Sequence, residues 1–230
     1  MDPTFSEDKG QSGRQAAFFD LDRTIIARIS GMALVQAAWE NDLIKIPDVI
    51  RASFLYAMYR AKIRDPLAVI GDMAGWVKGK TVVELDSLCD LATGTKLLPS
   101  VHPEAIAVIN MHRNNGRPAV ILSSALERIC RTIASELGMD DCICSSLESA
   151  DGLLTGKPSG RICFGREKLA RLTGYCKDGN IDLSGSWYYS DAISDVPVFE
   201  VVGHPVCVNP DRTLKKEGKR RGWTILEWNN

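Results

Sequence analysis

Apolar and polar residues follow two patterns along the chain, and these predict its fold class. Short continuous apolar runs, typical of strands buried on both faces, alternate with amphipathic stretches of about ten residues that are typical of helices. Strands and helices that alternate in this way form a doubly wound parallel α/β sheet. The predicted strands cover about 16–19, 119–122, 142–144, 186–189, 205–208 and 223–226, with a Gly-rich connection over 151–165.

Between residues 31 and 94 the pattern is helical throughout. Two of its segments begin beside a proline, Pro47 and Pro66, as helices often do. We therefore expect a disordered leader over 1–14, an α/β core over 15–30 and 95–230, and an inserted α-helical cap domain over 31–94. The four apolar stripes are Leu34, Val35, Ala38 and Trp39; Ile50, Phe54, Ala57 and Ala61; Leu67, Ile70, Met73 and Val77; and Val82, Leu85, Cys89 and Ala92.

The composition limits the classes of partner that the chain is expected to bind. The chain has 230 residues, enough for one domain with a sizeable insertion. Its net charge of −1 favours no nucleic-acid partner. No apolar run approaches the ~20 residues that span a bilayer, so we expect no stable membrane insertion. The first 14 residues lack the apolar centre of a signal peptide.

The seven cysteines are odd in number and include no Cys-x-x-Cys pair, and the three histidines have no zinc-site spacing. Free thiols are the expected state, which favours a cytoplasmic location. The chain is expected to be a monomer or a homodimer.

Two carboxylates follow the first predicted strand, in the run FFDLDRT that covers residues 18–24. Asp20 and Asp22 can face one small volume there, and crowded carboxylates need a cation, a shared proton, or both. This combination suits Mg²⁺-dependent phosphoryl transfer. The same spacing also fits a strand followed by an Asx turn, with Thr24 capping a helix.

Polar side chains also follow two later strands. Ser123 ends the second predicted strand, and Asp191 and Asp195 follow the strand at 186–189. Each of them alone could cap the next helix. In a parallel α/β sheet, however, ligands bind beyond the carboxyl ends of the strands, so these residues and Asp20 are expected at one edge.

These motifs and their order resemble the haloacid dehalogenase superfamily, in the phosphoserine-phosphatase-like branch with a helical cap after the first motif. FFDLDRT matches the first motif, VILSS the second, GREKL supplies the lysine of the third, and YYSDAISD is similar to the acidic fourth. Together they cover residues from about 16 to 210. The resemblance implies a phosphatase with a Rossmann-like α/β core.

The resemblance also implies a role for each acidic residue. Asp20 would be the nucleophile that forms an aspartyl-phosphate, and Asp22 the general acid and base. Mg²⁺ would be held by Asp20, Asp191 and the backbone carbonyl of Asp22, while Asp195 would hold a coordinating water or orient Lys168. An aspartate at position 22 favours hydrolysis over dehalogenase or pump chemistry.

Ser123 and Lys168 would contact the phosphoryl oxygens, and Thr24 would fix the loop that aims Asp22 and complete the phosphate-binding set. Lys168 by itself would be read as a solvated helix lysine. Lys157, in the run TGKPSG, is the second candidate for the phosphate lysine.

The substrate is expected to be a small phosphorylated metabolite. Phosphoserine phosphatases carry acidic residues after the first motif to receive the substrate amine, whereas this chain has Arg28 in the run IIARIS. Arg23 and Arg28 fit either a solvated surface or an anionic part of a substrate. The cap aromatics, Trp39, Phe54, Tyr56, Tyr59 and Trp76, fit either core packing or a pocket for a hydrophobic, lipid-like phosphate ester.

Two further alternatives stay open from the sequence. A phosphomutase would share the first half-reaction, and a non-catalytic phosphate- or Mg²⁺-binding module would keep the fold without turnover. The basic run at 215–221 is expected to be a solvated helix face.

Overall fold

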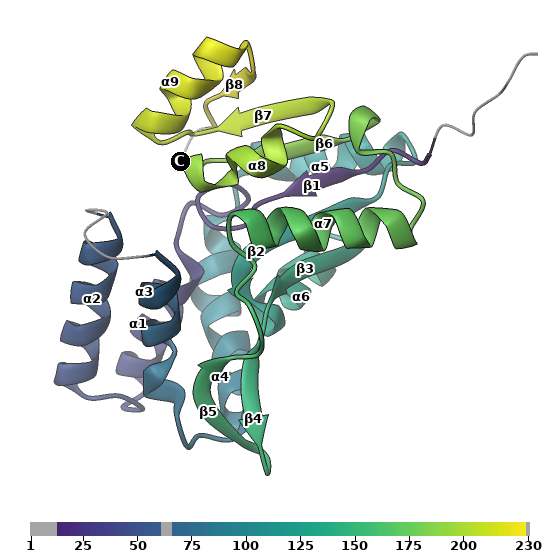
Figure 1. The fold of residues 1–230 in the computed structure, drawn as a ribbon. Helices are drawn as coiled ribbons and strands as arrows, with labels where there is room; N and C mark the ends of the chain where they lie inside the picture. The colour runs from purple at the N-terminus through teal and green to yellow at the C-terminus, as the bar shows by residue number, and fades with distance from the viewer. Residues whose placement is uncertain (1–12, 61–65, 229–230) are drawn as a thin grey trace, which may run out of the picture.

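A six-stranded parallel sheet forms the centre of the computed structural model, which describes residues 13–60 and 66–228 (Figure 1). The strand order is β3-β2-β1-β6-β7-β8, and each neighbouring pair is parallel. The predicted fold class is therefore confirmed, and β1 lies where the chain turns from one half of the sheet to the other. The strands are β1 (Ala17–Phe19), β2 (Ala119–Leu126), β3 (Asp141–Ser145), β6 (Trp187–Ser190), β7 (His204–Val208) and β8 (Thr224–Leu226).

Helices cover both faces of this sheet. Successive residues of β1 point to opposite faces, so that Phe18 and Phe19 belong to two separate hydrophobic cores. The Phe19 face is covered by α5 and α6, and the Phe18 face by α7, α8 and α9. The helices are α5 (Pro103–Asn114), α6 (Glu127–Glu136), α7 (Arg166–Asp178), α8 (Val196–Phe199) and α9 (Arg212–Arg221).

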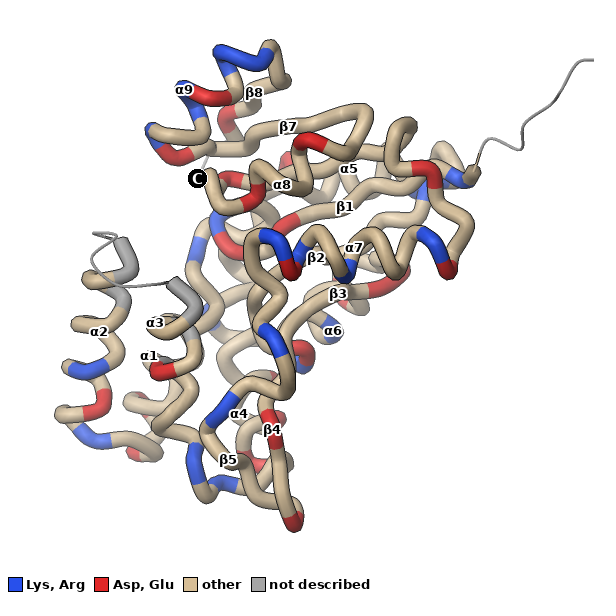
Figure 2. Tube along the Cα trace, in the orientation of Figure 1, with Lys and Arg blue, Asp and Glu red and all other residues tan. Residues whose placement is uncertain are grey.

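The basic run of the sequence forms the outer face of α9, where Figure 2 shows its lysines and arginines. Arg220 and Arg221 both bond to the carboxylate of Glu217 one turn earlier. This is the solvated, locally paired helix face that the sequence predicts.

One histidine is buried within the core. His112 of α5 has no exposed surface, and its Nε2 lies 2.8 Å from the hydroxyl of Tyr189. Burial lowers the pKa of His112 to about 4, with a smaller contribution from Arg117. The ring is therefore neutral at pH 7.

The helices after β1 stand beside the carboxyl edge of the sheet (Figure 1). Thr81 precedes the last of them and forms a capping box, since its hydroxyl oxygen accepts a bond from the Glu84 amide and the Glu84 carboxylate accepts one from the Thr81 amide. Boundaries at residues 31 and 94 for a separate cap domain stay a prediction, and the predicted leader lies largely outside the described residues. The helices are α1 (Ser30–Glu40), α2 (Ile46–Arg60), α3 (Pro66–Met73), η1 (Gly75–Val77) and α4 (Val82–Ala92).

The predicted buried stripe of α2 is wrong. Ile50 and Phe54 are 63% and 62% exposed, whereas Ala52 and Leu55 are buried. The neighbours of α2 are α1 and α3, and Ala52 belongs to the hydrophobic core that also contains residues of α1. Ala61 of the predicted stripe lies outside the described residues.

A two-stranded hairpin extends into the Gly-rich connection predicted over 151–165. β4 (Leu147–Ala150) pairs antiparallel with β5 (Leu153–Pro158). The turn is Asp151–Gly152, with φ of +51° and +78°, the backbone that Asp-Gly hairpin turns adopt. The hairpin also bonds to the insertion: the Gly79 amide donates to the Leu154 carbonyl, and the Leu154 amide donates to the Lys80 carbonyl, at 2.9 and 2.8 Å.

Among the described residues, no helix combines the length and the apolar character required to cross a bilayer.

Candidate active site

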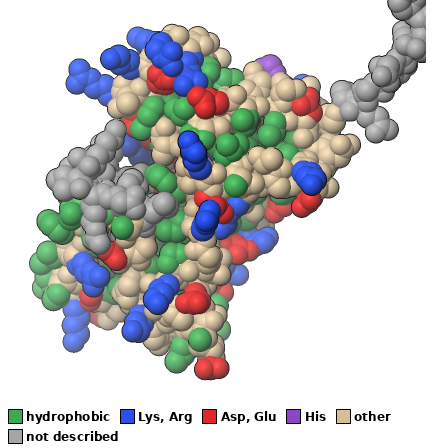
Figure 3. All heavy atoms as spheres, viewed as in Figure 1, with side chains coloured by type: hydrophobic (Ala, Val, Ile, Leu, Met, Phe, Trp, Pro, Cys, Tyr) green, Lys and Arg blue, Asp and Glu red, His purple; other side chains and the backbone are tan. Residues whose placement is uncertain are grey.

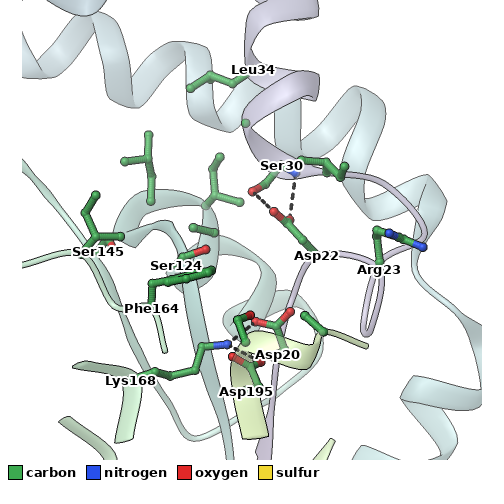
Figure 4. Close-up of a pocket in the computed structure, with 18 of the residues that line it drawn as sticks. Asp20, Asp22, Arg23, Ser30, Leu34, Ser124, Ser145, Phe164, Lys168 and Asp195 are labelled. Carbon is green, nitrogen blue, oxygen red and sulfur yellow. Dashed lines mark hydrogen bonds and ion pairs between the residues drawn. The ribbon is translucent and has the colours of Figure 1, made fainter. Parts of the chain in front are cut away.

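A cavity of about 710 Å³ lies beyond the carboxyl ends of β1, β2 and β6, between the sheet and the inserted helices. β1 delivers Asp20 to this edge, where the Asp20 amide donates to the Tyr189 carbonyl of β6 at 2.8 Å. Asp22, Lys168 and Asp195 line the same cavity (Figure 4). The structure therefore brings together side chains that lie up to 175 residues apart in sequence.

Lys168 is the buried cation of the site. Its Nζ lies 2.9 Å from Asp20 Oδ1, 2.8 Å from Asp195 Oδ2 and 3.0 Å from the Tyr188 hydroxyl. Burial alone would lower the pKa of Lys168, but the Asp195 and Asp20 carboxylates outweigh it, so that the pKa lies well above its ordinary value. Lys168 is therefore charged, and it faces the proposed nucleophile. Lys157, the competing lysine, is exposed on β5.

Asp195 holds this lysine in place. Its Oδ2 accepts bonds from the Tyr188 and Ser190 hydroxyls, both at 2.6 Å, besides the bond from Lys168. Asp195 precedes α8 but makes no side-chain cap hydrogen bond to it. Of the two roles implied for Asp195, the geometry supports the one that orients Lys168.

Asp22 is held by the first residue of α1. Its two oxygens accept bonds from the Ser30 amide at 2.8 Å and from the Ser30 hydroxyl at 3.0 Å (Figure 4). Burial, followed by the Asp20 charge, raises the pKa of Asp22 to about 7. A carboxyl group with this pKa holds and releases a proton near neutrality, as a general acid and base must.

Asp191 lines the same cavity as Asp20. Burial, followed by the Asp20 charge, raises its pKa to about 8, while the Arg23 guanidinium opposes the rise. Arg23 Nε lies 3.5 Å from Asp191 Oδ2, and Arg23 adopts the left-handed backbone with φ of +63°. Arg23 thus contacts a site carboxylate rather than solvent alone, whereas Arg28 is exposed.

A divalent cation fits this crowded pair of carboxylates. Besides burial, the Asp20 charge raises the pKa of Asp191, and a divalent cation held by the two carboxylates would offset their repulsion. Within the part of the chain that the structure describes, no three His, Cys, Asp or Glu side chains form a metal-binding cluster. The predicted set needs only two carboxylates, since Asp22 would contribute its backbone carbonyl, and waters and phosphate complete the shell of Mg²⁺.

Two predicted residues lie behind the cavity wall. Ser123 is buried, and its hydroxyl oxygen accepts a bond from the Ala125 amide at 3.3 Å. Burial raises the pKa of Asp20, and the nearby Ser123 hydroxyl opposes this rise. Thr24 is also buried, but its hydroxyl has no hydrogen-bond partner among the described residues, and it does not line the cavity. Their predicted contact with phosphate stays a prediction.

Three contributors were missed from the sequence: Tyr188, Ser190 and Ser30. Tyr188 was assigned to a buried strand, as its apolar neighbours suggest, although a buried tyrosine hydroxyl normally requires a partner. Ser190 ends the same strand directly before Asp191. A polar residue at the carboxyl end of a strand is a signal that could have identified Ser190 as part of the site. Ser30 carries no comparable signal, because its contact with Asp22 depends on the path of the loop between them.

A family model described as haloacid dehalogenase-like hydrolase matches residues 17–200. The chain belongs to this family, and it is a phosphatase of the phosphoserine-phosphatase-like kind. A relative described as a probable phosphatase, from Mycobacterium tuberculosis strain H37Rv, is 31% identical over 94% of this chain and 76% of its own length.

Solved structures share the fold. A protein of unknown function from Bordetella pertussis superposes with a TM-score of 0.85, at 24% identity over 93% of this chain and 98% of its own. A phosphoserine phosphatase with a phospho-aspartyl intermediate analogue superposes with a TM-score of 0.71, at 16% identity over 94% of this chain and 93% of its own.

Proposed function

We propose that the protein is a Mg²⁺-dependent phosphomonoesterase that acts on a small phosphorylated metabolite through an aspartyl-phosphate at Asp20. The observation that carries the proposal is the contact of Asp20 with the buried ammonium of Lys168 at 2.9 Å, beside Asp22 with its pKa of about 7. A nucleophile, a fixed positive charge for phosphoryl oxygens and a group that exchanges protons near neutrality are the parts that such hydrolysis requires.

In the first half-reaction, an Asp20 oxygen attacks phosphorus and the bond to the substrate oxygen breaks. Asp22, which is protonated in part of the molecules at pH 7, gives its proton to the leaving oxygen. In the second, the Asp22 carboxylate takes a proton from water, and the resulting hydroxide attacks phosphorus. The acyl phosphate bond breaks, which restores Asp20 and releases inorganic phosphate.

Lys168 would lie against the transferring phosphoryl group throughout and offset its negative charge. Asp195, Tyr188 and Ser190 keep the ammonium fixed, so that little reorganisation is needed during the reaction. Asp20, Asp191 and the Asp22 carbonyl would hold Mg²⁺, which supplies further charge neutralisation when bound. The free state of all seven cysteines supports a reducing, cytoplasmic location.

The test is Mg²⁺-dependent phosphate release from p-nitrophenyl phosphate by the wild type and by Asp20→Asn. We expect the variant to lose activity by at least a thousandfold, and EDTA to abolish wild-type activity until Mg²⁺ is restored. Asp151→Asn is the matched control, because Asp151 lies in an exposed turn whose positive φ asparagine also tolerates. Retained activity in Asp20→Asn would falsify the assigned nucleophile, and phosphate binding without turnover in the wild type would favour a binding module.

A further inference from the structure

The part of the cavity that lies away from the carboxylates is apolar. Leu34, Trp76 and Val77 line it from the inserted helices, and Leu126, Ile129 and Phe164 line it from the core. Leu34 and Phe164 lie on either side of the space in Figure 4. On the face shown in Figure 3, hydrophobic side chains are also visible between the inserted helices and the core.

Charged side chains are absent from this wall among the described residues. Beyond the catalytic cluster, the charged residues that line the cavity are Arg23, Asp211 and Arg212. Arg23 pairs with Asp191, and Asp211 accepts bonds from two backbone amides at the start of α9. The inserted helices and the segment from β2 to Phe164 therefore contribute no charge to the cavity, and the polar side chains there are serines.

Part of this wall belongs to a hydrophobic core, as Leu34, Val77 and Ile129 do, and part of it does not. Ile162 and Phe164 line the cavity, yet neither belongs to the two hydrophobic cores of the described chain. Ile162 is 7% exposed, and the surface that its neighbours leave uncovered lines the cavity. Phe164 is half-buried, so apolar surface of both residues is available to a ligand.

The chemistry of the wall selects the organic part of a substrate. An ammonium or carboxylate placed there would lose its water without gaining a partner of opposite charge, which is costly. An alkyl or aryl group gains free energy for each part of its surface that leaves water. The carboxylates and Lys168 at the other end form the site proposed for the phosphate, and Arg23 and Arg212, the other cations that line the cavity among the described residues, also suit an anion.

We propose that the substrate is a phosphate monoester whose organic group is apolar, an alkyl or aryl group that fills the space between Phe164 and the inserted helices. This inference rests on the proposed phosphatase function and specifies its substrate class. It disfavours amino-acid phosphates such as phosphoserine.

The first test measures kcat/KM for ethyl, butyl, hexyl and octyl phosphate with Mg²⁺, below their micelle concentrations, beside phenyl and naphthyl phosphate and phosphoserine. We expect kcat/KM to rise about fourfold for each added methylene until the cavity is full. Phosphoserine should fall below butyl phosphate. A rise in kcat/KM with carbon count in either the alkyl or the aryl series upholds the proposal and identifies the preferred shape. The absence of a rise in the alkyl series and in the aryl series overturns it.

The second test uses Phe164→Ser and the matched control Phe54→Ser. Phe54 is an exposed phenylalanine on α2 that does not line the cavity. We expect Phe164→Ser to lower the ratio of kcat/KM for octyl phosphate to that for ethyl phosphate by about tenfold. Phe54→Ser should leave this ratio unchanged. An equal ratio in the two variants would contradict the proposed site.

Binding of alkylphosphonates separates this inference from the proposed function, because their carbon–phosphorus bond is not hydrolysed by this chemistry. We expect the dissociation constant of the wild type to fall from ethyl- to octylphosphonate in titration calorimetry with Mg²⁺. If the dissociation constant depends on chain length but no ester is hydrolysed, the phosphatase function is overturned and the apolar site is supported. Turnover with chain-length-independent binding would overturn the apolar site alone.

Discussion

Replacement of Lys168 by methionine tests the charge balance of the site. Lys168 is 3% exposed, and its ammonium contacts the carboxylates of both Asp20 and Asp195. Methionine keeps a flexible unbranched chain but leaves two buried carboxylates without a cation. Removal of one partner from a buried ion pair costs about 3–5 kcal/mol, so we expect the free energy of unfolding at pH 7 to fall by about this amount.

The assay is urea unfolding followed by circular dichroism, in EDTA so that no divalent cation replaces the lysine charge. Lys157→Met is the control, since Lys157 is exposed, and its effect should lie within about 0.5 kcal/mol. The double variant Lys168→Met with Asp195→Asn removes one uncompensated charge together with the lysine. Its destabilisation should be smaller than the sum of the two single effects, because the residues are in contact.

The pH dependence has a definite sign. Burial raises the pKa of Asp20 and Lys168 opposes this rise, so loss of the lysine allows Asp20 to take up a proton more readily in the folded state. A raised carboxyl pKa makes folding more favourable as pH falls, and the deficit of Lys168→Met should shrink between pH 7 and pH 5. Equal destabilisation of Lys168→Met and Lys157→Met, or simple additivity in the double variant, would show that Lys168 does not balance the buried carboxylates.

Three other predictions concern single side chains. In stopped-flow assays, Asp22→Asn should release about one equivalent of nitrophenol in a burst and then turn over 10²–10⁴-fold more slowly than the wild type, because water activation is lost. A variant that shows no burst and turns over at the wild-type rate would contradict this. Tyr188→Phe should lose about 1.5–3 kcal/mol in urea unfolding, since its hydroxyl bonds to both Lys168 and Asp195. Between pH 7.5 and pH 5, the free energy of unfolding of the wild type should fall by about 2 kcal/mol more than that of His112→Gln, because the folded-state pKa of His112, about 4, lies below the unfolded value of about 6.5. Equal losses would show that His112 protonates freely in the folded state.

The position of the site could be predicted because it depends on local patterns. An apolar run that ends in Asp20 identifies both a buried strand and its carboxyl end, and the parallel sheet then determines which other strand ends lie nearby. Asp191 and Asp195 follow β6, the immediate neighbour of β1 in the sheet. Lys168 could be predicted only through its family motif, since a single lysine at a helix start is ordinary.

Contacts that depend on tertiary packing could not be predicted. The Tyr188 hydroxyl reaches Lys168 across 20 residues, and Ser30 reaches Asp22 only because α1 begins beside the strand end. The buried face of α2 also depends on where its neighbours lie, because apolar residues occur on more than one side of this helix. The β4–β5 hairpin differs in this respect, since its Asp151–Gly152 turn was a readable signal.

The bonds between the hairpin and the inserted helices define which parts of the molecule move together. The insertion is joined to the hairpin as neighbouring strands are joined. The contacts are the backbone bonds Gly79–Leu154 and Leu154–Lys80 and the bridge between Thr81 and Leu153. A motion that opens the cavity must break this ladder or carry the hairpin along with the helices. The natural moving unit is then discontinuous in sequence, and the amide hydrogens of Gly79 and Leu154 would report its opening by hydrogen exchange.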